Sequence, residues 1–340
     1  MDVKAYAKIN LGLDVLGRRK DGYHEVRMVM QQLELCDEIS IGRTGAETWG
    51  FEGSKAQGQA LGRTEGDEKF EISENNLVYN RNDSVHLKLF GESPDVPSDE
   101  RNLMYKAALL MKESCGISED IYISCRKHIP SQAGLAGGSS DAAAVMLGIN
   151  ELFSLDIERE ELMELAVKLG ADVPFCVLGG TALSEGIGER LTALRPAPHF
   201  HVLLAKPSEG VSTKDIYTAL DGSGLMEDKE GRHIRAERMD SLLSSIETGD
   251  GDRLSASLFN LLSEVTRERL PYIDELIARM QELGAEAALM SGSGPTVYGF
   301  FKDRESCGRA KEALNSELEA GRLSDLIETE FLKSEERMLL

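Results

Sequence analysis

A glycine-rich segment at residues 129–141, IPSQAGLAGGSSD, has the composition of a phosphate-binding loop. Gly134, Gly137 and Gly138 lack Cβ atoms, so backbone N–H groups there can approach an anion closely. The next three residues, Ser139–Asp141, are expected to cap a helix whose dipole favours negative charge. The segment is neither a Walker A loop nor a GxGxxG dinucleotide loop. It predicts a nucleotide site, although an ordinary glycine turn with a serine cap would give the same pattern.

Three polar residues elsewhere could take part in catalysis. Lys8 and Asn10 fall on one face of an alternating strand, and Asp172 follows a predicted helix in the segment LGADVPF. Pro174 is expected to hold Val173 in an extended conformation. Taken singly, these residues fit a solvated strand face and a surface turn equally well. Their combination with an anion loop is what suggests catalysis.

Two further motifs could contact a ligand. Tyr23 and His24 follow an Asp-Gly turn, where an aromatic ring and an imidazole could hold a planar base. A hairpin aromatic that packs on its neighbour is the alternative. The segment SGSGPT at 291–296 could approach an anion or could be a plain turn between a helix and a strand.

These residues must be positioned by alternating strands and amphipathic helices, which indicate an α+β protein. The predicted strands are Val3–Val15, Val26–Ile41, Ile121–Cys125, Gly179–Leu183, His201–Ala205 and Val297–Phe301. The predicted helices are Ser98–Cys115, Ser139–Phe153, Glu158–Leu169, Ser241–Ile246, Arg253–Leu262, Leu270–Leu283 and Arg309–Leu318.

The chain length of 340 residues favours two domains. The segment RPAPH at 195–199 has the composition of a linker, so we place the domains at 1–195 and 196–340. Two stretches, 42–76 and 221–237, have little hydrophobic periodicity and are interpreted as surface insertions.

The composition excludes several classes of function. A formal net charge of -21 argues against a nucleic-acid or anionic-membrane partner, which would require clustered cations. No signal peptide or membrane span is evident, and the five cysteines are widely spaced without a CxxC pattern. We therefore expect a cytoplasmic protein with reduced thiols, no disulfide and no structural zinc or other protein-bound metal site.

Three motifs together resemble the GHMP small-molecule kinases: AYAKINLGL from Ala5, the loop from Ile129 and LMSGSGPTVYG from Leu289. The resemblance spans most of the chain. It implies an N-terminal domain like domain 2 of ribosomal protein S5 and a C-terminal ferredoxin-like α/β sandwich. Ala5-Tyr6-Ala7 departs from the family pattern, in which a Pro-Ala pair is commoner at that place.

The resemblance also implies roles for individual residues. Asp172 matches the catalytic aspartate and Lys8 the catalytic lysine, with ATP as phosphoryl donor and Mg²⁺ bound as Mg-ATP. Asn10, Tyr23 and His24 match substrate-binding positions, and Tyr217 is the best candidate for a second aromatic on the base. The residues matching the ATP loop are Pro130, Ala133, Gly134, Leu135, Ala136, Gly137, Gly138, Ser139 and Ser140.

Three segments carry the resemblance to one branch of the family: DGYH, GLAGGSSDAA and LGADVPFCVLGGTALSEGIGE from Leu169, of which the last two are the most specific. They resemble the branch that phosphorylates the 2-hydroxyl of CDP-methylerythritol in the non-mevalonate isoprenoid pathway, acting as a monomer or homodimer. Another GHMP kinase, acting on homoserine or mevalonate, is the second hypothesis. A nucleotide-binding regulator without turnover is the third, and the presence of both Lys8 and Asp172 argues against it.

Overall fold

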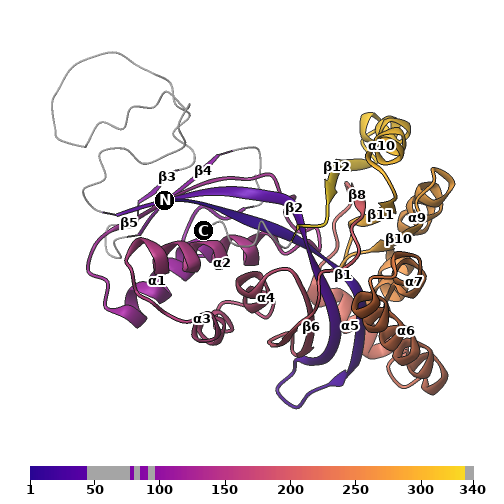
Figure 1. The fold of residues 1–340 in the computed structure, drawn as a ribbon, viewed down its shortest axis with the longest axis horizontal. Helices are drawn as coiled ribbons and strands as arrows, with labels where there is room; N and C mark the ends of the chain where they lie inside the picture. Colours follow the sequence, from indigo (N-terminus) through magenta and orange to yellow (C-terminus); the bar gives the residue numbers. More distant parts are fainter. Residues whose placement is uncertain (44–76, 80–84, 91–95, 334–340) are drawn as a thin grey trace.

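The computed structural model describes residues 1–43, 77–79, 85–90 and 96–333. These residues form two β-sheets with helices packed on them, and the long strands β1 and β2 reach from one half of the molecule to the other (Figure 1). The predicted two-domain α+β architecture is confirmed. The predicted insertion at 42–76 lies almost wholly outside the described residues. None of the described helices is long and apolar enough to cross a membrane.

The first sheet has eight strands among the described residues, including a short one from the second half of the chain. Its strands are β1 (Asp2–Arg18), β2 (His24–Arg43), β3 (Leu77–Tyr79), β4 (Val85–Phe90), β5 (Ile121–Arg126), β6 (Thr181–Gly186), β7 (Arg190–Ala193) and β9 (Phe259–Asn260). The helices of the first half are α1 (Leu103–Cys115), α2 (Gly137–Leu152), α3 (Arg159–Ala166) and α4 (Val173–Leu178).

β1 and β2 form the antiparallel pair that the sequence predicts at the start of the chain. The run from Val26 is one continuous strand and not several. The alternation in β1 predicts one solvated face, but every residue from Ala7 to Val15 is buried. Both faces are covered, because helices pack on one side and the second sheet contacts the other through the Tyr298 hydroxyl, which donates to the carbonyl of Asn10 at 2.8 Å.

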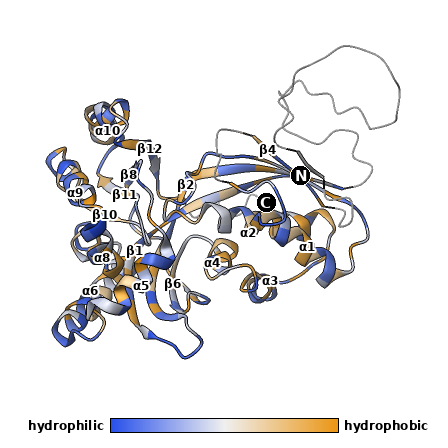
Figure 2. Cartoon of the chain, turned by 180° about the vertical axis from the view of Figure 1, so that it is seen from behind, coloured by the Kyte–Doolittle hydropathy of each residue, from blue (hydrophilic) through white to orange (hydrophobic). Residues whose placement is uncertain are grey.

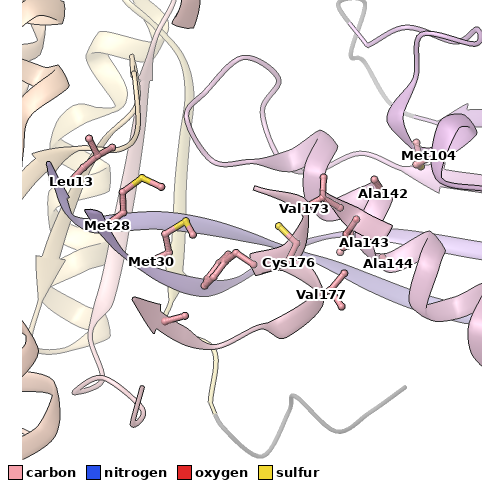
Figure 3. Packing of buried hydrophobic residues seen from close by; sticks show 14 of the residues in the cluster. Leu13, Met28, Met30, Met104, Ala142, Ala143, Ala144, Val173, Cys176 and Val177 are labelled. Atoms are coloured by element: carbon pink, nitrogen blue, oxygen red, sulfur yellow. The ribbon is translucent and has the colours of Figure 1, made fainter. Parts of the chain in front are cut away.

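Small side chains allow α2 and α4 to pack closely against this sheet. Ala142, Ala143 and Ala144 of α2 lie beside Val173 and other buried residues of α4 (Figure 3). Gly148 continues the close approach, because an added Cβ there would lie 2.5 Å from the Ile41 side chain on β2. Helix α2 is thereby held close to β2, and α4 packs on α2.

The second sheet has the order β10-β11-β8-β12 and is antiparallel. Its strands are β8 (His201–Pro207), β10 (Ala287–Met290), β11 (Val297–Phe301) and β12 (Leu323–Glu330). The helices of this half are α5 (Thr213–Ser223), α6 (Lys229–Thr248), α7 (Gly251–Ser257), α8 (Leu261–Arg269), α9 (Tyr272–Glu282) and α10 (Arg304–Glu319). This is the split βαβ arrangement of the predicted ferredoxin-like sandwich. Helices α6, α9 and α10 mix hydrophilic and hydrophobic residues, as helices covering one side of a sheet do (Figure 2).

The two sheets share chain segments at their junction. β9 pairs in parallel with β1, and Phe331 forms an isolated antiparallel bridge with Leu33 on β2. The second half therefore contributes a strand to the first sheet. The division of the chain at residue 195 stays a prediction.

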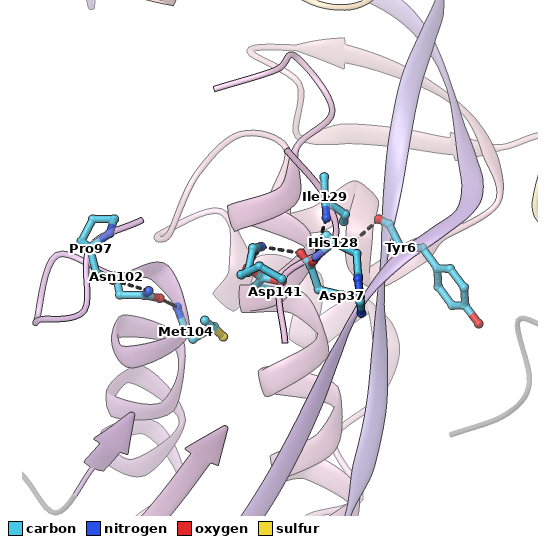
Figure 4. Close-up of polar contacts among 10 residues, drawn as sticks. Tyr6, Asp37, Pro97, Asn102, Met104, His128, Ile129 and Asp141 are labelled. Carbon is cyan, nitrogen blue, oxygen red and sulfur yellow. Dashed lines mark hydrogen bonds and ion pairs between the residues drawn. The ribbon is translucent and has the colours of Figure 1, made fainter. Parts of the chain in front are cut away.

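Three predictions about helices differ from the structure. Helix α1 begins at Leu103, because the Asn102 side chain accepts the N–H of Met104 as an N-cap, with a second bond to Pro97 (Figure 4). The predicted helix Arg253–Leu262 is divided by β9. The segment 221–237 is largely exposed, as predicted, but it is helical over most of its length: α6 starts at Lys229, and Arg235 forms a 2.6 Å ion pair with the buried Asp14.

Candidate active site

A cleft of about 1180 Å³ lies where the two halves of the chain meet. Its walls come from β1, the turn before β2, the glycine loop, the start of α4, helix α5 and the turn after β10. Cavities for one drug-sized ligand are typically about 300–1,000 Å³. The cleft is thus larger than a typical site for one ligand.

The glycine loop forms one wall of the cleft and rests on β1. The N–H of Lys8 donates to the carbonyl of Leu135 at 3.1 Å, and Gly134 has a left-handed φ of 73°. A Cβ at Gly134 would lie 2.3 Å from the carbonyl oxygen of Ser291, whose hydroxyl in turn donates to the Gly134 carbonyl at 2.9 Å. The two glycine motifs, far apart in the sequence, thus lie in direct contact.

The start of α2 differs from the predicted serine cap. The N-cap residue is Ala136, with a left-handed φ of 57° and no side-chain capping bond, and the helix begins at Gly137. The first helical bond runs from the N–H of Ser140 to Ala136 at 2.8 Å. The N–H groups of Gly137, Gly138 and Ser139 consequently have no partner within the helix, which is the arrangement that binds an anion.

Seven of the nine predicted loop residues line the cleft, and two do not. The lining residues are Pro130, Ala133, Gly134, Ala136, Gly137, Gly138 and Ser139. The Leu135 side chain is buried in the core instead. The Ser140 hydroxyl donates to the carbonyl of Tyr6 at 2.6 Å, so it fastens α2 to β1.

A cluster of buried charged residues lies beneath the loop, and the sequence analysis did not predict it. Lys127, which follows β5, pairs with both Asp37 on β2 and Asp141 on α2. Asp37 also accepts the backbone N–H groups of His128 and Ile129 (Figure 4). Burial raises the pKa of Asp141 to about 8, although Lys127 acts in the opposite direction. Asp141 is thus a structural anchor of the loop and not the predicted cap.

Lys8 and Asp172 face each other across the base of the cleft. The Nζ of Lys8 lies 3.8 Å from Oδ2 of Asp172 and donates to Oδ1 of Asn10 at 2.7 Å. Asp172 occupies the N-cap position of α4 without making a capping bond, and its side chain is 36% exposed. The expectation of an extended Val173 was wrong, because Pro174 lies in the first turn of α4, where proline is tolerated.

The DGYH turn brings His24 against helix α5. His24 Nε2 lies 2.7 Å from Oδ1 of Asp221, and its ring centroid lies 4.7 Å from that of Tyr217, tilted by 34°. Tyr23 is 59% exposed at the rim of the cleft. The structure therefore brings His24 and Tyr217 together and adds Asp221, which the sequence analysis assigned to an insertion.

The SGSG turn is held by Asn260, a residue that no sequence pattern singles out. The amide of Asn260 donates to the carbonyls of Met290 and Gly292, both at 2.8 Å. On the cleft side, the hydroxyls of Ser293 and Thr213 are 2.7 Å apart. The turn thereby joins β9, the glycine loop and helix α5 around one opening.

The site thus combines an anion loop, a Lys–Asp pair and an aromatic pocket around one cleft, which are parts that a small-molecule kinase requires. Comparison with protein families gives matches to the GHMP kinases N terminal domain at residues 102–180 and to the GHMP kinases C terminal at 242–320.

Relatives and solved structures agree with these matches. A 4-diphosphocytidyl-2-C-methyl-D-erythritol kinase of Clostridium botulinum is 41% identical, over 89% of this chain and 91% of the relative. A kinase of the same name from Caldicellulosiruptor saccharolyticus is 38% identical, over 99% of this chain and 100% of the relative. A crystal structure of 4-(cytidine 5'-diphospho)-2C-methyl-D-erythritol kinase superposes with a TM-score of 0.67 at 29% identity, covering 98% of this chain and 100% of that one.

A homoserine kinase structure from Cytophaga hutchinsonii has a TM-score of 0.69 at 19% identity, over 97% of this chain and 94% of that one, which shows the shared fold alone. The chain therefore belongs to the GHMP kinases, in the family of 4-diphosphocytidyl-2-C-methyl-D-erythritol kinases.

Proposed function

We propose that this chain transfers the γ-phosphoryl group of ATP to the 2-hydroxyl of 4-diphosphocytidyl-2-C-methyl-D-erythritol, giving the 2-phosphate and ADP. This reaction belongs to the non-mevalonate pathway to isoprenoid precursors. The observation that carries the proposal is the Lys8–Asp172 pair, which opens into the same cleft as the glycine loop. The relatives named for this substrate, at about 40% identity, support it.

Asp172 is the proposed proton acceptor. Its partly exposed carboxylate faces the cleft, and the 3.8 Å separation from Lys8 Nζ leaves room for a hydroxyl oxygen to approach both groups. Proton transfer to a positioned carboxylate raises the nucleophilicity of the alcohol, and the lysine charge stabilises the alkoxide that develops. Asn10 orients the ammonium group through its 2.7 Å hydrogen bond.

The start of α2 is the proposed site of the triphosphate. The N–H groups of Gly137, Gly138 and Ser139 have no partner within the helix, and these three residues line the cleft. In phosphoryl transfer, positioning and charge stabilisation do most of the work. The contact between Gly134 and Ser291 fixes the loop, so the donors are in place before ATP binds.

The site fits Mg²⁺ bound together with ATP. Magnesium prefers oxygen ligands and is usually held by one or two protein groups plus substrate phosphates. Ser131 and Ser139 both line the cleft, and Ser139, at the start of α2, would hold the ion together with phosphate oxygens. When bound, Mg²⁺ neutralises charge on the transferred phosphoryl group.

The His24–Asp221 pair is the proposed reader of cytosine. An ionised carboxylate only accepts hydrogen bonds, so Asp221 places the proton of a neutral His24 ring on Nε2 and leaves Nδ1 as an acceptor. This acceptor can take a hydrogen bond from the exocyclic amine of cytosine. Uracil has a carbonyl at that position, which is itself an acceptor and cannot donate a hydrogen bond. A uridine diphosphate analogue should have a much lower kcat/KM, and an equal value would refute this assignment.

ADP release in a coupled assay tests the function, with the cytidine substrate, homoserine and mevalonate compared side by side. Turnover with the cytidine substrate alone is the expected result. Comparable turnover with homoserine or mevalonate would make this a GHMP kinase of another specificity. ATP binding without turnover on any of the three would make it a nucleotide-binding regulator.

A further inference from the structure

Two histidines and a glutamate gather on one face of the second sheet, away from the cleft. His201 is the first residue of β8, His199 precedes it by two residues, and Glu330 ends the neighbouring strand β12. None of the three lines the cleft. We propose that these side chains form a binding site for one divalent metal ion of the zinc class.

The register of the sheet places the three ligands on the same face. His199 and His201 are two residues apart, so they point to the same side of an extended chain. Phe200 between them points the other way and is buried against Phe300 and Phe331. Glu330 is the direct antiparallel partner of His201. Because Phe200 is fixed in the core, both imidazoles are held outward beside the carboxylate.

The distances suit a small ion. Oε2 of Glu330 lies 2.9 Å from Nε2 of His199 and 3.5 Å from Nδ1 of His201. All three potential ligand atoms lie within 4.8 Å of one another. In a tetrahedral zinc site with bonds of ~2.0–2.1 Å, neighbouring ligand atoms are ~3.3 Å apart. The two separations that involve Glu330 lie within about 0.4 Å of this value.

The chemical nature of the three ligands determines which metal ion the site would prefer. Two imidazoles and one carboxylate suit zinc and other late first-row divalent ions better than Mg²⁺ or Ca²⁺, which prefer oxygen. His199 is 40% exposed and His201 is 23% exposed, so water can reach a fourth position. The other carboxylate oxygen of Glu330 lies 3.5 Å from Nζ of Lys333, which leaves Oε2 directed at the imidazoles.

The site joins chain segments that pass between the two sheets. The N–H of Phe331 donates to the carbonyl of Phe200, and the next N–H, of Leu332, donates to Gln32 on β2 at 3.1 Å. A metal ion on His199, His201 and Glu330 would therefore tie the RPAPH segment to the strand that returns to the first sheet. Since only the folded chain presents all three ligands, the ion should stabilise the native state.

The sequence analysis expects no structural zinc because it considers cysteine patterns. The proposed site uses no cysteine and lies at a His-x-His pair followed, far along the chain, by Glu330. The His-x-His spacing is visible in the sequence, but the third ligand is supplied by strand pairing and could not be found from it.

Calorimetric titration of zinc chloride into a tag-free, chelator-treated full-length chain tests the proposal. The expected result is one site per chain with micromolar affinity and a higher thermal unfolding temperature with zinc. His199→Gln and His201→Gln should each weaken binding at least tenfold. His233→Gln is the matched control, because His233 is an exposed histidine on α6. Within the described part of the chain, its ion-pair partner is Glu237 alone.

Cobalt supplies a second readout that needs no variant. Co²⁺ bound to the wild-type chain should give visible d–d bands without a sulfur-to-metal charge-transfer band, because all three ligands are imidazole or carboxylate. Zinc affinity that is unchanged in both glutamine variants, a thiolate charge-transfer band, or no binding below millimolar zinc would each overturn the proposal.

Discussion

The Nζ of Lys8 lies 3.8 Å from Oδ2 of Asp172, and its hydrogen bond goes to Asn10 instead. Lys8 is almost completely buried on β1, whereas the Asp172 side chain at the start of α4 is 36% exposed. The ammonium group is thus held by the protein, and the carboxylate is left facing the cleft. This asymmetry is what a proton acceptor beside a fixed positive charge requires.

Lys8→Met and Asp172→Asn should each lower turnover by roughly 10²–10⁴-fold, because each removes one partner of the proton-transfer step. ATP affinity should change little, since the loop N–H groups remain. Coupled ADP release and ATP calorimetry measure the two effects separately. Asp252→Asn, at a side chain that is 90% exposed, is the control. Near-normal turnover in either active-site variant would remove that residue from the chemistry.

Tyr217→Ala should weaken binding of the cytidine substrate while leaving ATP binding nearly unchanged. Loss of one aromatic ring from a stacked base costs about 1–3 kcal/mol, or roughly 5- to 150-fold in affinity. Tyr217→Phe keeps the ring and should retain most of the affinity, which separates stacking from the hydroxyl group. If calorimetry gives equal substrate affinity for wild type and Tyr217→Ala, the base lies elsewhere in the cleft.

Gly134→Ala should destabilise the ATP loop, and Gly138→Ala should not. Gly134 has a left-handed φ of 73°, and an added Cβ would lie 2.3 Å from the Ser291 carbonyl oxygen. The left-handed conformation alone costs a non-glycine residue about 1–2 kcal/mol. At Gly138 the nearest atom is a Leu103 methyl group at 3.6 Å, an ordinary contact. Equal thermal unfolding temperatures for the two variants would contradict the close approach of the two glycine motifs.

Asp141 should make stability depend on pH. Burial raises the pKa of this carboxyl from 3.8 to about 8, although Lys127 acts in the opposite direction. At pH values between these two pKa values, the folded chain binds more protons than the unfolded chain. The contribution of Asp141 to the free energy of unfolding is therefore full below about pH 4 and is lost as the pH rises to about 8.

Asp141→Asn cannot ionise, so it should flatten the fall in unfolding free energy over the upper part of that range. Urea unfolding between about pH 5 and about pH 8 measures the slope. Asp240→Asn, at a side chain that is 75% exposed, should keep the wild-type slope. A wild-type slope in Asp141→Asn would show that the buried charge cluster is ionised throughout.

The parts of the site that the sequence could predict are those carried by short local patterns. Lys8 and Asn10 follow from strand alternation, and the loop at 129–141 follows from its glycines. Pairing across the fold could not be predicted in the same way. Asp37 and Lys127 lie 90 residues apart in the sequence, and the partner of His24 is Asp221, in a segment that lacks periodicity.

Helix boundaries depend on interactions that composition alone does not show. The serines after Gly138 have the residue type of an N-cap, but Ala136 takes that place because the loop enters the helix in a left-handed conformation. Helix α6 has a polar composition and therefore resembled an insertion. Its packing is fixed by tertiary contacts such as the ion pair between Arg235 and Asp14.

Phosphorus NMR of the complete reaction tests the central claim most directly, because it reports where the phosphoryl group goes. With ATP, Mg²⁺ and the cytidine substrate, we predict ADP together with one new phosphomonoester signal and an unchanged diphosphate bridge in the substrate. Asp172→Asn should give no such signal in the same time. Release of inorganic phosphate without a new phosphomonoester would contradict the account.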